Sequence, residues 1–243
     1  MVVKTQAKLV EKYKLSDEVY HLIFKTNDEF NFKVGQFVNF VIPVQGEERP
    51  LRRSYSITSI SKEEENFIFE LCIKIEPEGK FTPQLQLADI GTQYDIMGPL
   101  GLFGLKHIEE GYDQVFIAAG TGIAPMRAFI KELLENIHYT SKVVLIFGVR
   151  SEEDILYLEE FQKFSKDFSQ FSYYVTLSRP TSNWEGRNGY VQEHLKDIIV
   201  KVKLNIHSTH FYMCGRTKMV DSVHEMLDSI NVVKENRSHE KFG

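Results

Sequence analysis

The chain contains 243 residues with a mass of 28.2 kDa, which suits one large domain or two domains of about 100 to 130 residues each. Apolar residues make up 42% of the sequence, charged residues 26% and aromatic residues 12%, which excludes an intrinsically disordered chain, a collagen-like repeat and a disulfide-rich module. The net charge of -5 is spread evenly along the chain, so no basic tract points to nucleic acid. Cys72 and Cys214 are the only cysteines, which excludes a four-cysteine iron-sulfur or zinc site within this chain.

No apolar run reaches the roughly 20 residues that a membrane-spanning helix needs. The beginning of the sequence also lacks the apolar core of a secretory signal. We therefore expect a cytoplasmic protein without a membrane partner. His207 and His210 form an H-x-x-H pair, but no third ligand stands at metal spacing, so we expect no metal site.

The first hundred residues predict antiparallel strands. Apolar and polar residues alternate over residues 19–26, 36–42 and 67–75, and glycine and proline separate these runs. Short strands of this kind close into a sandwich or a barrel.

Beyond residue 111 the pattern changes. Apolar runs of strand length alternate with helical patterns, which predicts a parallel sheet with right-handed crossovers. The expected strands cover residues 114–119, 143–147, 171–177 and 210–213, and the expected helices cover 125–136, 154–166, 189–196 and 217–228. We place a domain boundary within residues 106–111, which gives domains 1–108 and 109–243.

The strongest local motif is Gly120-Thr121-Gly122-Ile123-Ala124-Pro125, which follows an apolar strand and opens a helix. Glycines allow the backbone to approach a ligand closely, Pro125 suits the first helical position, and a helix N-terminus offers free amides to a phosphate. The motif departs from G-x-G-x-x-G because Pro125 stands at the third glycine position. It predicts a cradle for a nucleotide diphosphate, and the alternative interpretation is a tight strand-to-helix turn.

A second motif, Arg53-Ser54-Tyr55-Ser56, lies in the first half. On an extended strand Arg53 and Tyr55 share one face, so a guanidinium able to bind phosphate lies beside a ring that can stack on a planar cofactor. Alone, the motif is weak, and an ordinary strand edge with a solvated arginine is the more frequent explanation.

Further short motifs follow in a characteristic order. They are Leu71-Cys72-Ile73-Lys74, Gly79-Lys80-Phe81-Thr82, Gly98-Pro99-Leu100-Gly101-Leu102-Phe103, the Gly120 loop, Gly148-Val149-Arg150, Thr176-Leu177-Ser178-Arg179, Gly186-Arg187-Asn188-Gly189-Tyr190-Val191, Met213-Cys214-Gly215 and Glu240-Lys241-Phe242. This succession resembles the ferredoxin-NADP reductase family of flavoproteins over nearly the whole chain. The resemblance implies two domains: an N-terminal six-stranded antiparallel β-barrel for flavin and a C-terminal α/β parallel-sheet domain for nucleotide.

The resemblance also implies roles for individual residues. Arg53 would hold the flavin pyrophosphate, Tyr55 would pack against the flavin, and Ser56 would form a hydrogen bond near flavin N5. Ser56, Cys214 and Glu240 are the expected catalytic residues. The FAD residues that the resemblance implies are Arg53, Ser54, Tyr55, Ser56, Cys72, Ile73, Lys74, Gly79, Lys80, Phe81, Thr82, Thr121 and Phe242. The NAD(P) residues that it implies are Gly120, Thr121, Gly122, Pro125, Gly148, Val149, Arg150, Ser178, Arg179, Arg187, Cys214, Gly215 and Met219.

The cofactors follow from the same positions. FAD is favoured over FMN because Arg53 and residues 79–82 provide contacts for a pyrophosphate. Arg179 and Arg187 form a pair able to clamp a 2'-phosphate, and no acidic residue ends that strand, so NADPH is favoured. NADH stays open because Pro180 can turn Arg179 away.

We expect an FAD-dependent NAD(P)H oxidoreductase that delivers single electrons to a ferredoxin, a flavodoxin or a similar carrier. One alternative is the reductase component of an oxygenase or another multicomponent system whose iron-sulfur protein is a separate chain. A second alternative is a non-catalytic subunit that binds flavin or nucleotide.

Overall fold

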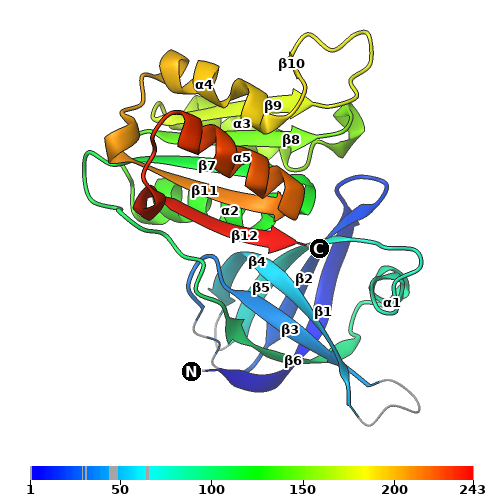
Figure 1. Ribbon diagram of the computed structural model, residues 1–243. Coiled ribbons are helices and arrows are strands. Elements are labelled where there is room, and N and C mark those ends of the chain that lie inside the picture. Colours follow the sequence, from blue (N-terminus) through cyan, green and yellow to red (C-terminus); the bar gives the residue numbers. More distant parts are fainter. Residues whose placement is uncertain (1, 29, 31, 44–48, 64–65, 243) are drawn as a thin grey trace. The chain divides into compact units, whose positions relative to one another are not determined.

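The structure is a computed structural model that describes residues 2–28, 30, 32–43, 49–63 and 66–242. The chain divides into two compact units (Figure 1). The barrel unit comprises Met1–Gly104 together with Arg127–Phe129, and the sheet unit comprises Leu105–Met126 and Ile130–Gly243. The boundary expected at 108/109 stays a prediction. No described helix is long and apolar enough to span a membrane.

The barrel unit is a closed barrel of six antiparallel strands, as predicted. The strands run in the order β1-β2-β5-β4-β3-β6, and the helix α1 lies between β5 and β6 in the chain. Their bounds are β1 Val3–Lys14, β2 Val19–Thr26, β3 Phe37–Ile42, β4 Leu51–Glu63, β5 Asn66–Lys74, α1 Thr82–Leu87 and β6 Gln93–Leu100. Closure leaves the barrel without unpaired edges, and alternate residues of each strand point into its core.

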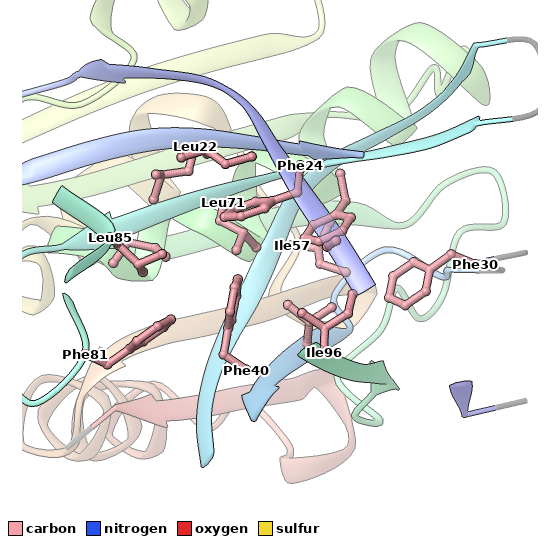
Figure 2. Close-up of a cluster of buried hydrophobic side chains, with 14 residues drawn as sticks. Leu22, Phe24, Phe30, Phe40, Ile57, Leu71, Phe81, Leu85 and Ile96 are labelled. Carbon is pink, nitrogen blue, oxygen red and sulfur yellow. The ribbon is translucent and has the colours of Figure 1, made fainter. Parts of the chain in front are cut away.

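Aliphatic and aromatic side chains fill the barrel core (Figure 2). The Phe24 ring from β2 stacks on the Phe69 ring from β5, with 5.4 Å between the ring centroids. Phe81 and Leu85, at the start of and within α1, are buried in the same cluster. The helix therefore covers the core with its apolar side, and this packing positions the residues that precede it.

The sheet unit contains six parallel strands in the order β10-β9-β8-β7-β11-β12. The strands are β7 Asp113–Ala119, β8 Val143–Val149, β9 Phe171–Leu177, β10 Arg187–Asn188, β11 Thr209–Arg216 and β12 Arg237–Phe242. The α-helices are α2 Ile123–Lys131, α3 Leu158–Asp167, α4 Val191–Val202 and α5 Thr217–Ser229. The short 3-10 turns are η1 Gly120–Gly122, η3 Glu152–Asp154, η4 Ile206–Ser208 and η5 Lys234–Asn236, and η2 Glu132–Asn136 is a π-helical segment that continues α2.

Two helices cover one face of this sheet. Helices α4 and α5 lie on the same face of the sheet (Figure 1). Alternate residues of β7, β8 and β11 form one buried cluster with the apolar sides of these helices. The central strands are continuous apolar runs in the sequence because both of their faces are buried. This is why the sequence pattern predicted their positions.

Element boundaries differ from the predictions where local hydrogen bonding intervenes. The helix expected from residue 125 begins at Ile123, because the η1 turn leads directly into it. The helix expected over 154–166 begins at Leu158, since Ser151 and Asp154 close a separate turn over η3. Helix α4 continues to Val202, beyond the expected end at 196, with Ile198 and Ile199 buried. The edge strands β10 and β12 have no apolar run, and the sequence did not predict them.

Candidate functional site

The Arg53–Ser56 motif lies on β4, which pairs with β3 in the barrel wall. Arg53 is exposed, and its Nη1 donates to the carbonyl oxygen of Arg52 at 3.0 Å. Ser54 donates to the side-chain oxygen of Asn39 at 2.6 Å, and Ser56 is buried, with 7% exposure. The motif thus presents one cation to solvent and buries a hydroxyl further along the strand.

The Tyr55 ring of this motif lies half-buried, near Phe40 of β3 and Phe81 at the start of α1. It meets Phe40 edge-on at 5.7 Å and lies 6.3 Å from the ring of Phe81. Burial raises the pKa of the Tyr55 hydroxyl to about 12, while the positive charge of Arg53 opposes the shift. Arg53 and Tyr55 are therefore neighbours, and the barrel core holds the Tyr55 ring in place.

The Gly79–Thr82 segment forms a tight turn before α1. The amide of Gly79 donates to the carbonyl oxygen of Glu76 at 2.8 Å, and Thr82 Oγ1 accepts from the Glu76 amide at 2.9 Å. A Cβ at Gly79 would lie 2.9 Å from the Glu76 carbonyl oxygen, so the turn requires glycine. No side chain caps the start of α1 in the described structure. Pro83 has no N–H, and the Gln84 and Leu85 amides donate to the Phe81 carbonyl oxygen at 2.9 and 3.2 Å, so among the described residues the Thr82 amide is the one at this helix start that remains for a ligand such as phosphate. An exposed guanidinium and this backbone amide in one unit fit the diphosphate of FAD.

The segment Cys72–Lys74 belongs to β5, inside the barrel wall. Cys72 and Ile73 are 5% and 1% exposed, and Lys74 pairs with Glu18 at 3.2 Å. These side chains are packed into the barrel or held in ion pairs, so backbone atoms are what this segment offers a ligand.

The Gly120–Pro125 loop joins β7 to α2 as a 3-10 turn. Gly120 is exposed with a φ of 55°, whereas Gly122 is buried. A Cβ at Gly122 would lie 2.2 Å from the carbonyl oxygen of Cys214, which only glycine avoids. The loop therefore packs directly on β11, and Pro125 lies in the first turn of α2, where its missing N–H costs no hydrogen bond.

Cys214 and Glu240 lie side by side on neighbouring strands. They are register partners in the β11–β12 pair, and Cys214 also pairs with Ala118 of β7. Burial raises the pKa of the Cys214 thiol well above its ordinary value, and the negative charge of Glu240 adds to the shift. The thiol is completely buried, so it stays protonated and lies beneath the surface. Gly215, with a φ of 155°, follows it, and a Cβ there would meet Met219 at 2.6 Å.

Two arginines meet where β8 and β9 end. The amide of Arg179 donates to the carbonyl oxygen of Arg150 at 2.8 Å, and the amide of Ser178 donates to that of Val149 at 3.0 Å. Both guanidinium-bearing side chains are exposed. A Cβ at the nearby Gly148 would lie 2.7 Å from Val191, so α4 packs closely on the end of β8.

Arg187, the expected partner of Arg179, is bound elsewhere. Its Nη2 donates to Asp197 Oδ2 at 2.6 Å, and its guanidinium lies over the ring of Tyr174 at 5.6 Å. The structure instead places Arg150 beside Arg179. The parallel order of β8 and β9 is the signal that could have paired them, since parallel strands end at the same edge.

The last expected site residue, Phe242, lies near the end of the chain. It is half-buried at the end of β12, opposite Arg216.

Among the described residues, no group of three or more His, Cys, Asp or Glu side chains is arranged to hold a metal ion.

Comparison with known proteins agrees with this division. Residues 6–104 match the family described as Oxidoreductase FAD-binding domain, and residues 116–225 match the Oxidoreductase NAD-binding domain. A chain with these two domains is an oxidoreductase that binds FAD and a nicotinamide nucleotide.

Individual relatives narrow the class. The chain is 32% identical over 225 residues to Ferredoxin--NADP reductase B of Sorangium cellulosum, covering 91% of this chain and 90% of the relative. It is 31% identical over 205 residues to a protein of the Na(+)-translocating NADH-quinone reductase of Neisseria gonorrhoeae, which covers 80% of this chain but 50% of that protein. The structure of Ferredoxin-NADP+ reductase from Plasmodium falciparum with 2'P-AMP superposes with a TM-score of 0.80 at 26% identity, over 98% of this chain and 96% of that one. The chain belongs to the ferredoxin-NADP reductase family.

Proposed function

We propose that this chain is an FAD-dependent NAD(P)H oxidoreductase that passes single electrons to a ferredoxin, a flavodoxin or a similar small carrier. The observation that carries the proposal is the convergence of Gly122, Cys214 and Glu240 in the sheet unit. The family resemblance names these three positions, which are far apart in the chain. Gly122 packs on the backbone of Cys214, and Cys214 is the register partner of Glu240, which supports the proposal. The Sorangium cellulosum relative, which this chain matches over 90% of its length, bears the name of such a reductase, which adds support.

The barrel residues bind and orient FAD in this proposal. When bound, FAD supplies hydride acceptance and single-electron release, chemistry that no side chain provides. Arg53 binds the diphosphate through its guanidinium, and the backbone amide of Thr82 at the start of α1 adds a neutral donor. The half-buried ring of Tyr55, held by Phe40 and Phe81, packs against the flavin ring.

Ser56, Cys214 and Glu240 are the proposed catalytic residues. The buried hydroxyl of Ser56 donates a hydrogen bond at flavin N5 and excludes water there. The carboxyl group of Glu240 holds or transfers a proton. Cys214 supplies an uncharged, polarizable group in the layer beneath the nicotinamide site, because burial and Glu240 keep its thiol protonated.

NADPH is the proposed donor. A 2'-phosphate carries two negative charges, and the exposed pair Arg150 and Arg179 offers two guanidinium groups at the ends of adjacent strands. Ser178 lies beside them and adds a hydroxyl. Arg187 joins them only by releasing Asp197, so it contributes less. NADH is the alternative donor, and the name of the Neisseria gonorrhoeae relative includes it.

The acceptor and the location complete the proposal. We propose a small electron carrier as the partner and the cytoplasm as the compartment, which cell fractionation tests. A reductase component whose iron-sulfur protein is a separate chain would show the same half-reaction, with a different acceptor.

An anaerobic titration of the purified protein tests the proposal, after its flavin has been released and identified. We expect bound FAD, bleaching of the flavin absorbance by NADPH at lower concentration than by NADH, and rapid reduction of ferricyanide. A protein that binds flavin but does not oxidise either nucleotide would instead be a non-catalytic binding subunit.

Substitutions at the strand ends test the donor separately. Arg150→Ser and Arg179→Ser should each weaken NADPH binding about 10- to 100-fold, the effect of losing one charge-assisted hydrogen bond, and leave NADH binding unchanged. Lys234→Ala, which removes an exposed cation at η5, is the matched control. Equal losses for both nucleotides would show that the arginines do not recognise the 2'-phosphate.

A further inference from the structure

Three pairs of side chains join helix α5 to strand β12, which are neighbours in the sheet unit (Figure 1). Asp228 accepts from Arg237 at 2.7 Å, and Asp221 accepts from Lys241 at 2.6 Å. Between these ion pairs, His224 Nε2 lies 3.1 Å from His239 Nδ1. The helix residues follow i, i+3, i+7 spacing and the strand residues alternate, so each set lies on one face.

The central pair differs from its neighbours because it joins two imidazoles. The rings are nearly perpendicular, at 87°, and their centroids lie 4.9 Å apart. Imidazole has an ordinary pKa of about 6.5 and is therefore mainly neutral at pH 7.5. One of the two facing nitrogens then carries the hydrogen, and the other offers its lone pair.

We propose that His224 and His239 form a binding site for a divalent transition-metal ion of the zinc class, which links α5 to β12. Imidazole nitrogen is a preferred ligand of zinc, at about 2.0 to 2.1 Å. Two such nitrogens at a tetrahedral angle are roughly 3.3 to 3.4 Å apart, slightly more than the 3.1 Å between them here. A small separation of the rings thus replaces the shared hydrogen by the metal.

Besides this small separation, binding requires a change of tautomer. The hydrogen between the rings moves through solvent to the far nitrogen of the ring that carried it, so no proton is released overall. Water completes the coordination. Asp221, one turn before His224 on the same face of α5, becomes a third ligand when it exchanges Lys241 for the metal.

Lys241 therefore competes with the metal for Asp221. Removal of Lys241 should tighten zinc binding, and this effect is specific to the proposed site. A plain hydrogen bond between two histidines would not bind zinc more tightly when a neighbouring lysine is lost. The site adjoins the proposed catalytic carboxyl group, because His239 immediately precedes Glu240 on β12.

Isothermal titration of the FAD-loaded, tag-free protein with zinc chloride at pH 7.5, in a buffer that does not chelate metals, tests the site. We expect one zinc ion per chain, at least 10-fold weaker binding in both His224→Gln and His239→Gln, and tighter binding in Lys241→Met. His207→Gln, at another exposed histidine, is the matched control and should bind like the wild type.

Two outcomes would overturn the site: no zinc binding by the wild type at 1 mM zinc, or an equal loss in His207→Gln and His224→Gln. Circular dichroism and flavin content confirm that each variant is folded. If one histidine variant is unfolded, the other histidine variant and Lys241→Met decide the question.

Discussion

His210 makes the stability of the sheet unit sensitive to acid. It lies on β11 with no exposure, its Nε2 is 2.9 Å from Ser238 Oγ, and its Nδ1 has no hydrogen-bond partner in the described structure. Burial lowers its pKa to about 3, and the positive charges of His107 and Lys106 add to that shift. The folded sheet unit therefore holds this imidazole in its neutral form at physiological pH.

The size of the effect follows from proton linkage. The unfolded chain binds a proton at His210 below about pH 6.5, whereas the folded chain does so only near pH 3. The stability that neutral His210 contributes is therefore fully present above pH 6.5, and it is lost as the pH falls from 6.5 toward 3. One pH unit corresponds to about 1.4 kcal/mol, so at pH 5.0 the wild type loses at most about 2 kcal/mol through His210.

His210→Phe removes the titrating group and keeps a ring beside Tyr212, which lies 4.6 Å from the His210 ring. Urea unfolding at pH 7.5, 6.0 and 5.0 can be followed through Trp184, the one tryptophan of the chain, which lies in the sheet unit. We expect the variant to be less stable by about 1 kcal/mol at pH 7.5, because it loses the bond to Ser238. Between pH 7.5 and pH 5.0 the wild type should lose about 2 kcal/mol of unfolding free energy through His210, and the variant should not. The difference in unfolding free energy should therefore shift by about 2 kcal/mol in favour of the variant. Parallel stability curves for the two proteins would refute the reasoning.

Three further predictions concern catalysis, the barrel and the nucleotide loop. Ser56→Ala and Glu240→Ala should each slow hydride transfer about 10- to 100-fold in stopped-flow experiments with flavin retained, and wild-type rates would remove these residues from the mechanism. Burial alone would raise the pKa of Glu70, yet His21 and Arg127 lower it to about 2. Glu70→Gln leaves the 9% exposed side chain of Arg127 without its carboxylate and should cost about 3 kcal/mol, measured as flavin release in urea; an unchanged midpoint would contradict this. Gly122→Ala should weaken both nucleotides at least about 10-fold and destabilise the sheet unit by about 1 to 3 kcal/mol, while Gly104→Ala, whose Cβ would meet nothing closer than 4.0 Å, should not.

Much of the fold could be predicted from the sequence because the determinants are local. Alternation with period two located β2 and β3, and continuous apolar runs located β7, β8 and β9, since each pattern reflects which faces of a strand are buried. The Gly120 loop was recognisable because a strand, two glycines and a helix follow one another directly. Element ends were less predictable, because side-chain bonds such as the one from Ser151 to Asp154 decide them.

The pairing of strands decided which distant residues of the candidate site lie together. The sequence alone determined the residue types available for binding: the Arg53–Ser56 motif, the glycine loop, and the arginines and cysteine that follow. The tertiary structure decided that Cys214 lies beside Glu240, that Gly122 packs on Cys214, and that Arg150 rather than Arg187 stands next to Arg179. These contacts join distant parts of the chain through strand order and register, and a one-residue shift in register would point each side chain to the opposite face of the sheet.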